Sequence, residues 1–226
     1  INVYVILFKA DVDGSGRDLE NGVFPWFQKG LGNNMYVWGR LIRAMIKAKF
    51  APTIHPPEDI SSITLRVWPQ DLDINMHVNN GRYLAFMDIG RFDLLARSGL
   101  GAQVLREKWQ PVLTGVNARY RRSLGVFQRF RLETRVAGWT ENSLFMEHTI
   151  IPLSGRHKGE VAVTATVRAV MLKDGRKLPA TEMLSPLGPL PESPPLPEAC
   201  ALLMSPEERA RARSADDANA QDTRVG

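Results

Sequence analysis

Residues 71–83 read DLDINMHVNNGRY, and this stretch decides how the middle of the chain folds. Asn80-Gly81 is by itself a strong hairpin signal. Apolar residues then recur at three- and four-residue spacing, which predicts a helix over about residues 79–98. Because this helix begins directly after the asparagines, the hairpin interpretation fails, and Asn79 or Asn80 is predicted to form part of its N-cap.

Strand-like segments surround the helix. Strands that follow one another in sequence usually pair in space, so they can form a curled antiparallel sheet that buries the apolar helix. We therefore predict an α+β domain over residues 59–178, with one curled antiparallel sheet wrapped around one long central helix. The predicted strands cover residues 62–68, 111–120, 130–136, 143–153 and 160–172, with turns at residues 138–142 and 174–175.

The flanking segments differ from this domain in composition. Residues 1–34 begin with Ile, and we expect an N-terminal extension that is not native if translation starts at Met35. Residues 35–58 combine an amphipathic helix with a Pro-rich linker. Residues 179–226 are first Pro-rich and then charged, with little to bury, so they are expected to be disordered or loosely docked.

The segment of residues 36–50 predicts a basic amphipathic helix, because it has four cations and no acid. Its larger apolar residues share one stripe. Two interpretations remain open: the stripe packs on the domain's own core, or the helix lies on anionic lipid. The stripe consists of Val37, Leu41, Ile42, Met45, Ile46 and Phe50.

Composition narrows the class of protein. The 226 residues are 44% hydrophobic, enough for a substantial core, and the net charge of +5 suits nucleic acid, an anionic membrane or a phosphate-bearing small molecule. The single Cys200 excludes an internal disulfide framework and fits a reducing compartment, so a cytoplasmic location is expected. No apolar run reaches the ~18 to 20 residues of a membrane span.

Polar residues at every second position mark the candidate chemistry. Asp73, Asn75 and His77 face one side if the segment is extended or loosely turned. The following helix presents free amide groups and its positive dipole end to the same region. A carboxylate, an amide, an imidazole and oxyanion donors in one loop are sufficient for acyl-group hydrolysis. The alternative is structural: Asp and Asn as caps, and a His that is satisfied within the fold.

Other chemistries find less support in the sequence. A zinc site on Asp73 and His77 lacks further ligands at suitable spacing. No serine lies in a G-x-S-x-G elbow. The basic residues at 119–131 are typical of a solvated strand face rather than a nucleic-acid site. We therefore expect no metal, no redox cofactor and no nucleic-acid partner.

The order strand, DLD-x-N-x-HVNN-x-x-Y, long helix and four strands resembles the hotdog-fold thioesterases. The similar branch contains the acyl-CoA thioesterases of the 4-hydroxybenzoyl-CoA type and the acyl-ACP thioesterases, and the resemblance covers about residues 60–178. By this resemblance the family Asp falls on Asp73. The partner residues of the acyl-ACP branch fall on Asn75 and His77, and the helix-terminal amide of the hydroxybenzoyl branch falls on the backbone N–H of Asn80.

One position departs from the acyl-ACP pattern. There an acidic residue follows a segment similar to Tyr120-Arg121-Arg122, whereas this chain has Ser123. Either this chain does not use the acyl-ACP mechanism, in which four residues including this acid take part, or another acidic residue takes the place of the missing one. The candidates for that acid are Glu133, Glu141 and Glu147.

The resemblance implies a thioesterase that hydrolyses acyl-CoA, with a role in fatty acid metabolism, because the chain holds one hotdog unit and plant-type acyl-ACP enzymes typically carry two. Alternatives are an acyl-ACP thioesterase, or a non-catalytic acyl-thioester-binding or membrane-surface protein that uses residues 37–50. A homodimer or dimer of dimers is implied, with CoA present only as part of the substrate. The implied substrate contacts are Asn79, Tyr83, Phe86 and Met87, with Arg119, Arg121, Arg122 and Arg129 for the CoA phosphates.

Overall fold

The structure is a computed structural model that describes residues 35–189, 192–204, 206 and 208–210. Its order of elements confirms the α+β class. The helices are α2 (Met35–Phe50), α3 (Asn80–Arg97), α4 (Leu100–Arg106), α5 (Ala180–Met183) and α6 (Glu198–Ala201). The strands are β1 (Ser61–Arg66), β2 (Gln110–Tyr120), β3 (Arg129–Thr140), β4 (Ser143–Pro152), β5 (Val163–Lys173) and β6 (Arg176–Lys177).

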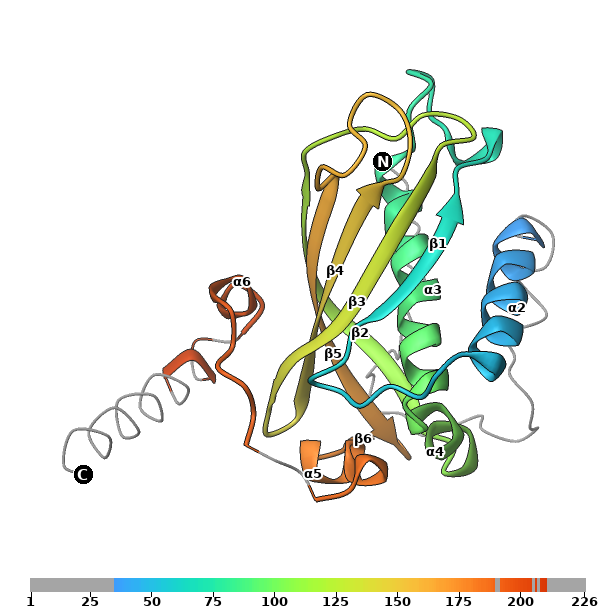
Figure 1. Cartoon of the computed structure of the whole chain (residues 1–226). Helices are drawn as coiled ribbons and strands as arrows, with labels where there is room; N and C mark the ends of the chain where they lie inside the picture. Colours follow the sequence, from blue (N-terminus) through green and yellow to red (C-terminus); the bar gives the residue numbers. More distant parts are fainter. Residues whose placement is uncertain (1–34, 190–191, 205, 207, 211–226) are drawn as a thin grey trace.

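The strands form one antiparallel sheet in the order β1-β3-β4-β5-β2, with β6 paired to β5. The sheet curls around α3, as predicted (Figure 1). Several boundaries differ from the prediction, and the largest difference is at the end of β3. β3 continues to Thr140, because a bulge leaves Ala137 unpaired and pairing resumes at Gly138, which moves the turn to residues 141–142.

The long helix lies unusually close to the sheet. Residues of α3 at three- and four-residue spacing, including Tyr83, Phe86 and Leu94, are buried beneath the strands. A Cβ added at Gly90 would overlap with Thr134 Oγ1 and would lie 2.9 Å from the Leu132 side chain. Only glycine therefore fits at this point of contact between α3 and β3.

A polar contact accompanies this close approach. The fully buried His148 lies 3.2 Å from Arg91 Nη1 through Nε2, and 3.0 Å from Thr134 Oγ1 through Nδ1. Because a guanidinium only donates hydrogen bonds, Nε2 accepts, and Nδ1–H donates to Thr134. Burial, assisted by the charge of Arg91, holds the pKa of His148 well below its usual value, so the ring is neutral.

Helix α2 packs against α3, but not through its apolar stripe. Ala44 and Ala48 are buried and Leu41 is half-buried, whereas Ile42, Met45, Ile46 and Phe50 are exposed. The interpretation that the stripe packs on the core is therefore wrong for these positions, because small residues at four-residue spacing allow the closer helix contact. The exposed fractions are 54% for Ile42, 52% for Met45, 58% for Ile46 and 82% for Phe50.

Of the two expectations for residues 179–226, disordered or loosely docked, the structure shows a docked arrangement for part of the segment. Ala180, Met183 and Leu184 are buried in the main core. Cys200 and Met204 pack with Phe145 on the face of the sheet that points away from α3. The predictions for residues 1–34 and 211–226 lie outside the described residues. In the part of the chain that the structure describes, no helix is long and apolar enough to cross a membrane.

Replacing Gly90 with alanine should destabilise the protein. The added methyl group cannot fit against Thr134 without moving α3, and overpacking of this kind costs about 1–3 kcal/mol. Gly39→Ala is the matched control, because no atom lies within 4 Å of its added Cβ and alanine gains up to about 1 kcal/mol of helix propensity. Urea unfolding of both variants measures the difference. Equal stability of the two would contradict the close approach.

The buried His148 should make stability fall in mild acid. Below pH about 6.5 the unfolded chain binds a proton that the folded protein does not, so the free energy of unfolding drops as the pH falls, by up to about 1.4 kcal/mol per pH unit. Above pH about 6.5, His148 is neutral in both the folded and the unfolded state, and it no longer makes the free energy of unfolding depend on pH. Stability measured from pH 7 to pH 5 should depend less on pH in His148→Gln. The same dependence on pH in wild type and His148→Gln would contradict this effect of the buried ring.

Candidate active site

The loop between β1 and α3 is closed at its base by backbone hydrogen bonds. Leu72 and Val78 form an isolated antiparallel bridge. The N–H of Asn79 donates to the carbonyl of Asp71 at 2.9 Å, and the N–H of Val78 donates to the carbonyl of Leu124 at 3.0 Å. These bonds hold the turn of residues 73–77 directly in front of α3.

Asp73 organises that turn. Its Oδ1 accepts the N–H of Asn75 at 2.8 Å and the N–H of His77 at 3.3 Å. Met76, between them, adopts a left-handed φ of 59°, which is uncommon for a residue with a side chain. No residue in the described part of the chain donates to Oδ2 of Asp73. One carboxylate oxygen is therefore available to a ligand or to water.

The side chains of Asn75 and His77 are exposed in the same turn. Our expectation of a shared face assumed an extended or loosely turned segment, and the chain is tightly turned here. Among the described residues, no hydrogen bond joins the side chains of Asp73, Asn75 and His77. The structure thus brings the three residues into one turn, and their chemical roles stay predictions.

The N-terminus of α3 is capped as predicted. The Asn79 side chain accepts the N–H of Gly81 at 2.8 Å. Asn80 is the first helical residue, and its backbone N–H has no acceptor among the described residues. The hydroxyl of Tyr120 donates to the Asn80 carbonyl at 3.3 Å. A free amide at the positive end of a helix suits the stabilisation of a developing negative charge.

The predicted acyl contacts on α3 lie in the core instead of an open pocket. Tyr83, Phe86 and Met87 are 2%, 1% and 0% exposed, because α3 is seated so closely on the sheet. The Tyr83 hydroxyl accepts the N–H of Leu124 at 3.2 Å. Burial raises the pKa of Tyr83 to about 12, and the charge of Asp73 adds to this effect.

The predicted arginines gather at the end of the sheet where α3 begins. The strand register places the end of β2 and the start of β3 at this end (Figure 1). Arg122 pairs with Glu160 at 3.0 Å. Arg119, Arg121 and Arg129 are exposed and form no ion pair with any described residue.

None of the proposed substitutes for an acid at Ser123 reaches this end. Leu132 and Thr134 face α3, so Glu133 between them points to the other face, where it pairs with Arg131 at 2.8 Å. Glu147 likewise precedes the inward-facing His148 and pairs with Arg135. Glu141 lies in the turn between β3 and β4, at the opposite end of the sheet. Within one chain the structure therefore brings none of the three to the site loop, and the substitution stays a prediction.

A buried ion pair supports the loop, and the sequence analysis missed it. Asp71 is fully buried, and Arg40 of α2 donates to both of its oxygens, at 2.6 and 3.1 Å. Arg40 also donates to the carbonyl of Arg66 at 3.0 Å, and its guanidinium lies 5.1 Å from the centre of the Phe86 ring. A signal was present: Arg40 lies four residues before Ala44, on the face that packs against α3.

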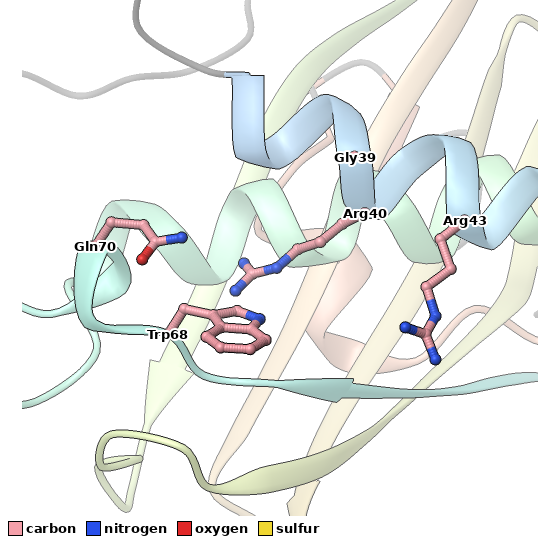
Figure 2. Close-up of a pocket in the computed structure, with 5 residues that line it drawn as sticks. All are labelled: Gly39, Arg40, Arg43, Trp68 and Gln70. Carbon is pink, nitrogen blue, oxygen red and sulfur yellow. The ribbon is translucent and has the colours of Figure 1, made fainter.

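Figure 2 shows Arg40 and Arg43 of α2 opposite Trp68 in the connection after β1. Together with Gly39 and Gln70 they line an open groove of ≈ 340 Å³. Arg40 borders this groove while its guanidinium holds Asp71. Within the described residues, no cluster of three or more His, Cys, Asp or Glu could hold a metal ion.

The sequence pattern of the family described as the thioesterase-like superfamily matches residues 67–202, more than half of the chain. The chain belongs to the thioesterase-like superfamily. The match begins just after β1, so it includes the turn of Asp73 and all of α3. It does not include α2, and Arg40 therefore reaches the site loop of this thioesterase-like domain from outside the matched region.

The chain is also similar to individual proteins and solved structures. Protein THEM6 of Xenopus laevis is 32% identical over 118 residues, which are 52% of this chain and 56% of that protein. The 4-hydroxybenzoyl CoA thioesterase of Pseudomonas sp. strain CBS-3 has a TM-score of 0.51 at 15% identity, covering 56% of this chain and 98% of that one. A mutant 4-hydroxybenzoyl CoA thioesterase complexed with 4-hydroxybenzoyl CoA has a TM-score of 0.52 at 14% identity, covering 57% and 99%.

These structural likenesses show the fold, a hotdog fold, which the resemblance in the sequence predicted. The chain spans about half the length of the relatives that it matches in sequence.

Replacing Arg40 with methionine should destabilise the protein strongly. The substitution leaves Asp71 buried without its partner, and breaking a buried pair in this way costs about 3–5 kcal/mol. Arg43→Met is the matched control on the same helix. Because Arg43 is exposed, its replacement should change the free energy of unfolding by no more than about 0.5 kcal/mol. Denaturant unfolding of the two variants tests this. A similar small effect of both would show that α2 is not held by the ion pair.

Proposed function

We propose that this protein is a hydrolase that cleaves acyl-CoA thioesters, with Asp73 as the central catalytic group. The observation that carries the proposal is the turn of residues 73–77. None of the described residues donates a hydrogen bond to Oδ2 of Asp73, which lies in the turn beside the N-terminus of α3 and the Asn80 amide. This pairing of a carboxylate with an oxyanion donor meets the needs of acyl transfer to water.

In the proposed reaction, Asp73 either removes a proton from a water molecule that attacks the thioester carbonyl, or attacks that carbonyl itself. The carbonyl oxygen becomes negatively charged and accepts a hydrogen bond from the Asn80 amide. The carbon–sulfur bond breaks, and CoA leaves as the thiolate. Water supplies the second oxygen of the acid product, directly or by hydrolysis of an acyl-Asp73 intermediate. His77 and Asn75 orient the water and polarise the carbonyl.

From the positive charge at the end of the sheet where α3 begins, we infer that CoA carries the acyl group. Arg119, Arg121 and Arg129 are exposed, and guanidinium groups match phosphate geometry, so they are the proposed contacts of the CoA phosphates. Arg122 would join them by exchanging Glu160 for a phosphate. That a protein of the same fold is complexed with 4-hydroxybenzoyl CoA supports a CoA thioester as the ligand.

The acyl group is proposed to lie at a boundary between two copies of the chain. The α3 face around Phe86 is closed within one chain, so an acyl chain needs another surface. Among the described strands, β2 ends the sheet and pairs only with β5, which leaves an edge of 11 residues for a second copy. A homodimer joined along β2 would bring two site ends together, and a cytoplasmic location is proposed with it.

Asp73→Asn should reduce kcat/KM for the best acyl-CoA by about a hundredfold, or roughly 2.7 kcal/mol of transition-state stabilisation. Release of free thiol from acyl-CoAs of increasing chain length measures this. Asp174→Asn is the matched control, because Asp174 is an exposed turn residue at the far end of β5 and its left-handed φ of 51° suits asparagine.

The results separate the candidate functions. Full activity of Asp73→Asn would exclude the Asp73 mechanism, although not the activity. If the wild type cleaves acyl groups from an acidic acyl carrier protein but not from CoA, the arginines serve that carrier instead. Binding of acyl-CoA without thiol release from either carrier would favour a non-catalytic binding protein.

A further inference from the structure

The outward face of α2 carries a continuous apolar ridge. Ile42, Ile46 and Phe50 follow one another at four-residue spacing, with Met45 beside them, and all four side chains are at least 52% exposed. Arg40, Ala44 and Ala48 form a second ridge, which packs on the domain. The two ridges are offset by two residues, or about 200° around the helix. Ile42, Ile46 and Phe50 therefore point away from the protein.

This orientation is the reverse of the usual arrangement. A helix on the surface of a protein normally turns its large apolar residues toward the core and its polar residues toward water. Here the ion pair of Arg40 with Asp71 and the small residues Ala44 and Ala48 fix the opposite orientation. Contiguous apolar surface of this kind marks an interaction site.

Charge indicates what covers the ridge. Helix α2 contains no acidic residue, and Arg43, Lys47 and Lys49 are exposed beside the apolar ridge. None of these three cations forms an ion pair with a residue in the described ranges. Large apolar side chains with cations along their flank are typical of a helix that lies in the plane of an anionic membrane surface.

We propose that the outward face of α2 docks on an anionic lipid surface. Ile42, Met45, Ile46 and Phe50 enter the boundary between headgroups and acyl chains, while Arg43, Lys47 and Lys49 contact the lipid phosphates. The inference rests on the geometry of α2 and does not depend on the proposed thioester hydrolysis.

A second copy of the chain fits this face less well. In a twofold contact each α2 would meet the same surface of its partner. Three cations from each helix would then face one another with no acid on either helix. Like charges brought together across an interface oppose association. An anionic surface, by contrast, attracts each of these residues.

Docking would act close to the site loop. Arg40, on the opposite ridge of the same helix, holds Asp71, and the carbonyl of Asp71 accepts the N–H of the α3 cap residue Asn79. The site loop is thus fastened to the helix that meets the lipid.

Flotation with vesicles of phosphatidylcholine, with and without phosphatidylserine, tests the proposal with the full chain. The wild type should float with the phosphatidylserine vesicles, less so at high salt, and weakly with phosphatidylcholine alone. Ile42→Gln/Ile46→Gln should reduce the bound fraction on anionic vesicles about tenfold or more by removing apolar contact. Lys47→Gln/Lys49→Gln should reduce it about tenfold by removing charge.

Leu105→Gln is the matched control, since Leu105 is 68% exposed but lies on α4, and it should float like the wild type. All these positions are exposed, so circular dichroism and thermal unfolding should show intact folds. Absence of the wild type from anionic vesicles would overturn the proposal. So would undiminished flotation of Ile42→Gln/Ile46→Gln. Loss of self-association in that variant, measured by sedimentation without lipid, would assign the face to a second copy and would equally overturn it.

Discussion

The carboxylate of Asp71 has no access to solvent, and the position of the site loop depends on how that charge is satisfied. Arg40 supplies two hydrogen bonds from α2, and the N–H of Trp68 supplies another at 2.8 Å. A carboxylate buried without such partners would be very costly, so α2 and the loop after β1 form one unit. Arg40 also rests on the ring of Phe86, which extends this unit to α3. Helix α2, the site loop and α3 are therefore all in contact through the ion pair of Arg40 with Asp71.

The sheet fixes the other side of the site. Gly90 lets α3 lie directly against β3, and this contact sets where the N-terminus of the helix emerges at the end of the sheet. The Tyr120 hydroxyl then bonds to the Asn80 carbonyl, and the Tyr83 hydroxyl accepts an N–H from the β2–β3 connection. The turn of Asp73 is thus held from two directions, by the buried ion pair on one side and by the ends of β2 and α3 on the other. A site built in this way needs no pocket within the core.

Periodicity in the sequence was sufficient for α3 and the strands, because their apolar residues face the one large core. It failed for α2, where the same pattern occurs but Ala44, Ala48 and Arg40 decide which face docks. Hydrophobic spacing cannot show that a small residue allows a closer contact than a large one. Alternation along the strands does place Glu133 and Glu147 on the face opposite to Thr134 and His148, whereas their distance from the site loop follows from strand pairing that spacing does not contain. In the turn, the order Asp73, Asn75, His77 identified the candidate residues, while their orientation follows from backbone hydrogen bonds that no spacing rule contains.

The region that matches the family begins at residue 67, so Arg40 is a support that its pattern does not contain. The free energy of unfolding of a domain is only about 5–15 kcal/mol. Breaking a buried ion pair costs several kcal/mol, which is a large share of that total. Docking of α2 and order in the site loop are therefore thermodynamically linked. Any ligand that binds the outward face of α2 while the helix is docked stabilises the loop by the same free energy with which it prefers the docked helix. Conversely, a ligand that orders the loop favours docking of α2, although the two surfaces share no contact.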